Sequence, residues 1–370
     1  MRSHISKMAT KTPTRNLSRY FMPAEHSTQS STLLAYPTAP SLYPHQVQGA
    51  RSEILSIANA ISKFEPVTIF VHPEDAKELK ANLQNHVMEA RENVSVKEVE
   101  LESLWIRDSG PVFVLDKEKQ VRGVDFGFNY WGRKLPLASD MGLAKRVLST
   151  SSIERIDAGI IAEGGGIEVD GEGTLFACES SIVNKNRNPG MSKDVVEEKL
   201  KQVLGVEKVV WLKGVKGEDI TDCHVDALAR FVEPGTVVLS RPYGRERGVW
   251  MDVFEDAKRV LKRETDARGR KFKVVEIEEP DWDLVEQEPE CSGPGEQFAS
   301  VYSYVNYLLV NGGVIAPKFG DDKRDQVCRK VLEELFPERK VVQVHINMLP
   351  RAGGGIHCAS QQVPAGKEAE

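Results

Sequence analysis

The stretch GIEVDGEGTLFA, residues 166–177, has the pattern of a tight β-hairpin. Two apolar runs flank a turn of Asp and Gly residues, which reverse a strand readily. An amphipathic helix follows, with apolar residues at helical spacing between Val196 and Leu204, and then a third apolar strand over residues 208–212. The stretch therefore predicts a unit made of a hairpin, a helix and a third strand.

The same order of elements recurs at residues 112–156, 226–277 and 304–344. Two predicted strands have no adjacent strand with which to form a hairpin, residues 32–35 and 356–361. Pairing these two strands with each other would complete a fifth unit and close a ring. Helices that connect hairpins argue against a doubly wound parallel sheet, in which helices connect single strands. The sequence predicts a five-bladed α/β propeller with pseudo-five-fold symmetry.

We predict a disordered tail over residues 1–20 and a single α/β-propeller catalytic domain over residues 21–365. The tail is rich in Ser, Thr and basic residues and contains no acidic residue. This composition also resembles a transit peptide, so the sequence leaves open whether the tail is a targeting segment.

The composition is that of an ordinary soluble globular protein, with 370 residues, 40% of them hydrophobic and 28% charged. No apolar run is long enough for a membrane span. The net charge of -6 gives no indication of nucleic-acid binding and is compatible with a cationic substrate. The five cysteines have no paired spacing, so we expect neither disulfides nor a structural zinc site, but a reducing, cytoplasmic location.

Residues with catalytic chemistry stand at or just before the first strand of several units. Equivalent positions in a radial repeat converge on its axis, so these residues are expected to share one central pocket. His224 and Asp226 lie two positions apart on a predicted strand, which places them on one face. The candidates are Asp108, Glu163, His224, Asp226 and Cys358.

A cysteine, a histidine and three carboxylates in one pocket suit attack on a planar guanidinium group. Asp108 and Asp226 would hold the guanidinium through paired hydrogen bonds. Glu163 would orient His224, which would move protons to the leaving ammonia and from the incoming water. The substrate cation would favour a thiolate at Cys358, which would then add to the guanidinium carbon.

Each candidate also has an ordinary structural alternative. Asp108 could cap a turn, and Glu163 could be a surface loop residue. His224 and Asp226 could form a structural hydrogen-bonded pair, and Trp105 could belong to the core rather than wall the alkyl part of a substrate. The remaining cysteines are expected to be inert, namely Cys178, Cys223, Cys291 and Cys328.

Several ordered motifs resemble the agmatine deiminase family, which includes the bacterial-type peptidylarginine deiminases. The resemblance spans nearly the whole chain, from Met22 to Gln362. The motifs that carry it are Trp105-Ile106-Arg107-Asp108-Ser109-Gly110-Pro111, Glu163-Gly164-Gly165, Asn184-x-Asn186-Arg187-Asn188-Pro189, His224-Val225-Asp226, Asn311-Gly312-Gly313 and Gly353-Gly354-Gly355-Ile356-His357-Cys358.

The resemblance implies a pentein fold and hydrolysis of a guanidine through a covalent thiouronium on the cysteine, without metal or organic cofactor. By position it makes Cys358 the nucleophile, His224 the acid and base, and Glu163 the partner of His224. It makes Asp108 and Asp226 the guanidinium ligands. Trp105, Gly354 and Gly355 complete the predicted substrate-binding residues, Trp105 as a wall for the alkyl part and the glycines as a close backbone approach to the ligand.

The chain departs from the family pattern at residues 26–29, at Tyr36, before Ile356 and over residues 286–298. These departures leave the proposed chemistry intact, but they leave open the identity of the substrate beyond its guanidinium group. The sequence also leaves the oligomeric state open, with a homodimer among the options.

The favoured function is hydrolysis of agmatine to N-carbamoylputrescine and ammonia, a step of putrescine and polyamine biosynthesis. The alternatives are free, methylated or peptidyl arginine as substrate, a zinc hydrolase that uses the same His, Asp, Glu and Cys, and a silent polyamine-binding protein. No basic residue adjoins the motifs except Arg107 and Arg351, which favours agmatine over an α-carboxylate substrate.

Overall fold

The computed structural model describes residues 19–39, 42, 44–85, 88–135, 138–244, 248–285 and 300–367. The expected tail lies outside these residues except for Arg19 and Tyr20, and residues 286–298 also lie outside them. Tyr20 begins strand β1, one position before the predicted start of the domain.

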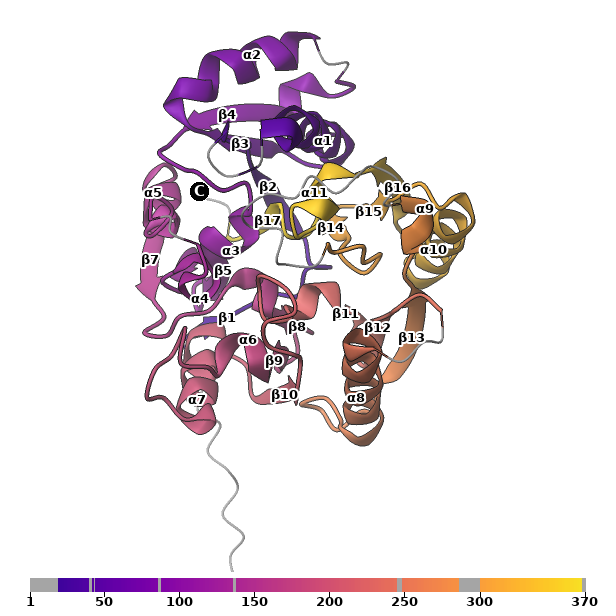
Figure 1. Ribbon diagram of the computed structural model, residues 1–370. Coiled ribbons are helices and arrows are strands. Elements are labelled where there is room, and N and C mark those ends of the chain that lie inside the picture. Colours follow the sequence, from indigo (N-terminus) through magenta and orange to yellow (C-terminus); the bar gives the residue numbers. More distant parts are fainter. Residues whose placement is uncertain are drawn as a thin grey trace, which may run out of the picture.

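The described chain forms five small sheets arranged around a common centre, with the longer helices on the outside (Figure 1). In every unit the first two strands pair antiparallel and the second pairs parallel with the third. This arrangement confirms the predicted five-bladed α/β propeller.

The first three units follow one another along the chain. The first contains β1 (Tyr20–Phe21), α3 (Ile106–Ser109), β5 (Val112–Asp116), β6 (Val121–Asp125), α4 (Tyr130–Arg133), α5 (Leu143–Ser149) and β7 (Glu154–Asp157). The second contains the 3-10 turn η4 (Gly164–Gly166), β8 (Ile167–Val169), β9 (Thr174–Cys178), α6 (Glu179–Ile182), α7 (Lys193–Leu204) and β10 (Lys208–Leu212). The third contains the 3-10 turn η5 (Val225–Ala227), β11 (Ala229–Glu233), β12 (Thr236–Arg241), α8 (Val249–Arg263), β13 (Lys273–Glu278) and α9 (Trp282–Val285).

The last two units include both ends of the domain. The fourth contains β14 (Leu308–Val310), β15 (Gly313–Lys318), α10 (Asp322–Leu335), β16 (Lys340–His345) and α11 (Met348–Arg351). The fifth contains β2 (Gln29–Ala35), α1 (Pro44–Ser62), β3 (Val67–Val71), η2 (Pro73–Asp75), α2 (Ala76–Asn85), η3 (Arg91–Asn93), β4 (Val94–Glu98) and β17 (Ser360–Pro364).

The fifth unit closes the ring, because its hairpin is built from segments at opposite ends of the domain. Ser360 of β17 pairs with Leu34 of β2, and the two strands run antiparallel. β3 and β4 then extend this sheet in parallel. The pairing of residues 32–35 with the C-terminal strand is therefore confirmed.

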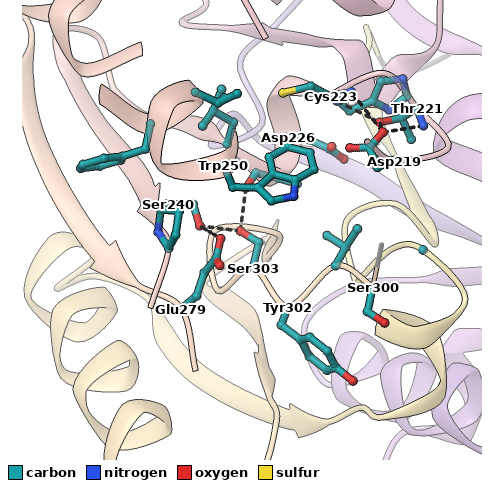
Figure 2. Close-up of a pocket in the computed structure, with 18 of the residues that line it drawn as sticks. Asp219, Thr221, Cys223, Asp226, Ser240, Trp250, Glu279, Ser300, Tyr302 and Ser303 are labelled. Carbon is teal, nitrogen blue, oxygen red and sulfur yellow. Dashed lines mark hydrogen bonds between the residues drawn. The ribbon is translucent and has the colours of Figure 1, made fainter. Parts of the chain in front are cut away.

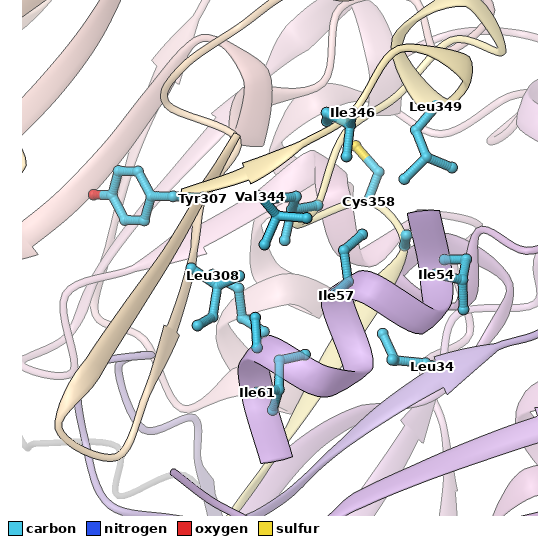
Figure 3. Packing of buried hydrophobic residues seen from close by; sticks show 14 of the residues in the cluster. Leu34, Ile54, Ile57, Ile61, Tyr307, Leu308, Val344, Ile346, Leu349 and Cys358 are labelled. Carbon is cyan, nitrogen blue, oxygen red and sulfur yellow. The ribbon is translucent and has the colours of Figure 1, made fainter. Parts of the chain in front are cut away.

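Apolar faces of the helices fix them onto the sheets. In α1, Ile54, Ile57 and Ile61 recur at helical spacing and are fully buried. Figure 3 shows these side chains in one cluster with Leu308 of β14 and with Cys358. The segment that carries Cys358 is thus part of the packed core, which restricts its movement.

A buried ionic cluster joins the units at the centre; we call it the hub and define it as Glu25, Glu168, Arg230 and His357. Arg230 of β11 lies 2.9 Å from Glu25 and donates to Glu168 of β8 at 2.9 Å. His357 lies 2.8 Å from the same Glu25 carboxylate, which also accepts the backbone N–H of Leu309 at 2.7 Å. The hub therefore connects the second, third, fourth and fifth units.

Replacing Arg230 by Met should lower the free energy of unfolding by about 3–5 kcal/mol, because Glu25 and Glu168 would be left buried without their cation. Denaturant unfolding of the two proteins at pH 7 would measure this difference. As a control, Arg259→Met removes an exposed pair with Asp256 within α8 and should cost less than about 1 kcal/mol. An equal loss in both variants would contradict the role given to the hub.

Candidate active site

The structure brings the five sequence-predicted catalytic residues to the central ends of four units. Asp108 lies in α3 before β5, and Glu163 immediately precedes η4 and β8. His224 and Asp226 lie at η5 before β11, and Cys358 lies two residues before β17. All five are buried, with relative exposures of 5%, 0%, 4%, 0% and 8% for Asp108, Glu163, His224, Asp226 and Cys358.

The sulfur of Cys358 is held between a carboxylate and an amide. Its Sγ lies 3.5 Å from Oδ2 of Asp226, and Nδ2 of Asn306 donates to it at 3.2 Å. Oδ1 of Asn306 accepts the backbone N–H groups of His357 and Cys358. One side chain thus fixes both the position of the sulfur and the backbone that carries it.

The glycine run before Cys358 is required by close packing. A Cβ on Gly354 would lie 2.5 Å from the ring of Trp105, and a Cβ on Gly355 would lie 2.5 Å from Oδ1 of Asn306. Real Cβ atoms do not approach other atoms so closely, so a side chain at either position would displace Trp105 or Asn306. The glycines let the loop lie directly on both residues.

The imidazole of His224 lies between two carboxylates. Its Nε2 is 3.3 Å from Oε2 of Glu163, and its Nδ1 is 3.6 Å from Oδ1 of Asp108. Asp108 accepts the backbone N–H of Gly165 at 3.0 Å and the indole N–H of Trp131 at 2.8 Å. A Cβ on Gly165 would lie 2.7 Å from His224, so glycine is needed there as well.

These contacts set the charges in the site. Burial opposes a charge on His224, but Asp108 and Glu163 raise its pKa to about 9, so the imidazole is a cation at neutral pH. Burial, together with the charges of Asp226 and Asp108, raises the pKa of the Cys358 thiol well above its ordinary value. The empty site therefore holds a protonated thiol beside a protonated imidazole.

The two carboxylates predicted to bind the substrate, Asp108 and Asp226, differ in pKa. Burial raises the pKa of Asp108, and the positive charge on His224 opposes this effect. Burial acts in the same direction on Asp226, but the hydrogen bond with His357 and the charges of His357, His224 and Arg230 together outweigh it and lower the pKa of Asp226. Asp226 is thus the more firmly ionised of the two.

Four supporting residues were not predicted to have a role. Arg187 donates to both oxygens of Glu163 and to Asp222, and His357 lies 2.7 Å from Asp226. Their signals were present, since Arg187 lies in the Asn-x-Asn-Arg motif and His357 precedes the cysteine. The other two are Asn306 and Trp131.

The strand that was predicted to carry His224 and Asp226 begins later than expected, so this part of the prediction is wrong. Residues 225–227 form the 3-10 turn η5, and β11 begins only at Ala229. Asp222 and Cys223 have φ values of 64° and 71°, in the left-handed region, so the chain turns sharply before His224. The positions of His224 and Asp226 therefore do not depend on the alternation of a strand.

A cavity of about 70 Å³ is lined by Cys358, His224 and Asp226, among other residues. Figure 2 shows Asp226 in its wall. Oδ1 of Asp226 and Nδ1 of His224 are buried without a hydrogen-bond partner among the described residues. A buried polar atom without a partner is costly, so these atoms mark where a ligand would bind.

Other predicted substrate-binding residues lie outside this lining. Trp105 is 8% exposed and packs in the core cluster, against Gly354. Asp108 and Gly355 are likewise not part of the cavity wall, and Asp108 contacts His224 from another side. Only Asp226 of the predicted substrate-binding set faces the cavity.

Among the residues that the structure describes, no group of three or more His, Cys, Asp or Glu side chains is arranged to hold a metal ion. In the same part of the chain, no helix has both the length and the apolar character needed to cross a membrane.

The sequence and the fold are similar to those of known proteins. The agmatine deiminase of Pseudomonas fluorescens is 37% identical over 383 residues, which cover 97% of this chain and 99% of the relative. The agmatine deiminase of Ectopseudomonas mendocina is 35% identical over 381 residues, with the same coverage. The solved structure of the agmatine deiminase of Enterococcus faecalis superposes with a TM-score of 0.84 at 28% identity, covering 94% of this chain and 96% of that one.

These similarities extend over almost all of the described structure and include the pentein arrangement of five α/β units. The model of the Porphyromonas-type peptidyl-arginine deiminase family matches residues 21–364. That range runs from β1 to the last residue of β17, and so includes the ring closure and all five candidate catalytic residues. The chain therefore belongs to the Porphyromonas-type peptidyl-arginine deiminase family.

Proposed function

We propose that this protein hydrolyses agmatine to N-carbamoylputrescine and ammonia, with Cys358 as the nucleophile. The observation that carries the proposal is the cavity that ends at Cys358, His224 and the unpaired oxygen of Asp226. The full-length similarity to agmatine deiminases supports the same substrate.

The guanidinium group binds beside Asp226, whose free Oδ1 accepts one of its N–H groups. Asp108 lies on the other side of His224 and adds negative charge to the site. The planar carbon of the guanidinium is then held within reach of Sγ of Cys358, which lies 3.5 Å from Asp226.

The chemistry has two steps. Sγ of Cys358 gives up its proton to solvent and forms a bond to the guanidinium carbon, while a C–N bond breaks and ammonia leaves with a proton from His224. A thiouronium remains on the sulfur. Water then attacks its carbon and gives one proton to His224. The C–S bond breaks with its electron pair returning to sulfur, which takes the second proton of the water as the C=O bond forms. The product is a substituted urea.

Substrate binding itself prepares the nucleophile. In the empty site, burial and the carboxylates Asp226 and Asp108 keep the thiol of Cys358 protonated by raising its pKa. A bound guanidinium places a positive charge beside the sulfur and offsets these carboxylates, which favours the thiolate. The nucleophile is therefore generated mainly when its substrate is present.

The charge of the cavity favours agmatine over arginine. Its described lining contains Asp219, Asp226 and Glu279 but no Lys or Arg. An α-carboxylate would meet like charges there and would lack the basic partner that carboxylate recognition requires.

The proposed location is the cytoplasm, a reducing compartment. The four cysteines within the described residues are all free. Cys178 and Cys223 are the closest pair, and their sulfur atoms lie 4.0 Å apart without a disulfide.

The first prediction concerns the covalent intermediate. His224→Ala should slow the water step, so that an amidino adduct accumulates on Cys358 after mixing with agmatine. Quenching, digestion and mass spectrometry would place the added mass on the peptide that contains Cys358. Cys358→Ser should bind substrate but release almost no ammonia, because its hydroxyl is not ionised.

Added mass on the Cys223 or Cys178 peptide instead, or substantial turnover in Cys358→Ser, would contradict this assignment. A zinc hydrolase would form no adduct and would lose activity on chelation. A silent polyamine-binding protein would be stabilised by agmatine without releasing ammonia.

The second prediction concerns the carboxylates. Asp108→Asn and Asp226→Asn should each cost about 2–4 kcal/mol of transition-state stabilisation, a loss of roughly 30-fold to 1000-fold in kcat/KM. Steady-state ammonia release would measure it, with thermal melting to verify the fold. The matched control is Asp157→Asn, an exposed residue paired with Arg155, which should leave kcat/KM unchanged. Turnover at the unmutated level in either site variant would refute the assigned role.

The third prediction concerns substrate choice. Because the described cavity wall contains three carboxylates and no Lys or Arg, kcat/KM for agmatine should exceed that for free arginine by at least about tenfold. Ammonia release should be measured side by side with agmatine, arginine and an arginine-containing peptide. A higher kcat/KM for arginine or for the peptide would show that the substrate assignment is wrong.

A further inference from the structure

A second carboxylate faces the cavity away from the catalytic end. Glu279 follows β13, and its backbone N–H donates to the carbonyl of Arg241 at 2.8 Å, which continues the pairing of β13 with β12. Its side chain lines the same cavity as Cys358. Figure 2 shows its carboxylate turned toward Ser240 and separate from Asp226, with Trp250 drawn between them.

Neutral groups hold this carboxylate in place. Ser240 donates to Oε1 of Glu279 at 3.0 Å, and the side chain of Trp282 forms another hydrogen bond to the carboxylate. Burial raises the pKa of Glu279 to about 7, and the only opposing effects come from these two neutral donors. Glu279 is thus a half-buried acid whose negative charge has no cationic partner among the described residues.

Aromatic side chains also line the cavity. The described lining includes Trp250, Phe254, Trp282 and Tyr302, and Figure 2 shows Trp250 between Asp226 and Glu279. Aromatic faces pack well against a methylene chain and also attract a cation. The cavity therefore offers a carboxylate at each end and an apolar passage between them.

We propose that Glu279 binds the distal cation of the substrate, so that the cavity selects linear dications with a guanidinium at one end and an ammonium at the other. This inference rests on the proposed function and assigns the residue that recognises the far end of the molecule. An ammonium at Glu279 forms a charge-assisted hydrogen bond and keeps the carboxylate ionised. Neutral alkylguanidines lose this contact.

A matched pair of substrates isolates the contact. Agmatine and n-pentylguanidine differ only in the terminal group, an ammonium in one and a methyl in the other. In the unmodified protein, kcat/KM for agmatine should exceed that for n-pentylguanidine by at least about tenfold. Glu279→Gln should lower kcat/KM for agmatine roughly 10-fold to 100-fold, mainly through KM, and leave n-pentylguanidine within about twofold.

The control variant is Glu276→Gln, which makes the same substitution on β13, the strand that Glu279 follows. Glu276 is half-buried and pairs with Lys258 of α8 at 2.7 Å, and it is not part of the described cavity wall. The ratio of kcat/KM for agmatine to kcat/KM for n-pentylguanidine should be the same in the Glu276→Gln variant as in the unmodified protein.

The outcomes separate this inference from the proposed function. Equal losses for both substrates in Glu279→Gln would overturn the inference but leave guanidine hydrolysis intact. If the variant fails to fold, the unmodified protein still decides, since equal kcat/KM for the two substrates would overturn it. If neither guanidine yields ammonia with the unmodified protein, the proposed function fails, and this inference fails with it.

Discussion

The carboxylate of Glu25 is the contact on which the rest of the structure depends. It lies 2.9 Å from Arg230, 2.8 Å from His357 and 3.9 Å from Arg107, and it accepts the backbone N–H of Leu309. Burial alone would oppose its charge, but these cations lower the pKa of Glu25. A buried charge is tolerated only when its partners are well placed, so the five units must meet in one arrangement for the hub to form.

The hub also holds the candidate active site in place, because the His357 side chain of the hub contacts Asp226 of the site. His357 bonds to Glu25 through Nε2 and to Asp226 through Nδ1, and Asp226 in turn contacts Cys358. Arg107 adjoins Asp108 in sequence and donates to the carbonyl of His357. The carboxylates that would hold a guanidinium therefore have little freedom to relax toward each other, which keeps an acidic site ready for a cation.

The fold could be predicted from the sequence because its signals are local. Turn residues between apolar runs and the helical spacing that follows each hairpin identified four units, and the unpaired ends identified the fifth. The candidate residues could be placed because each precedes the first strand of its unit. The sequence did not reveal features that lack a local signal. The turn at Asp222 and Cys223 takes positive φ values without glycine, and Arg187 and Glu279 lie far along the chain from the site residues of their own units.

Ring closure has a consequence for how the chain is made. β2 leaves the ribosome early, yet its antiparallel neighbour β17 follows only after more than 300 positions, as the Ser30 to Val363 contact across 333 positions shows. Until then one edge of the fifth sheet is unpaired and open to pairing with other chains. The same late segment carries Cys358, so a nascent chain holds no nucleophile in place while its ring is open.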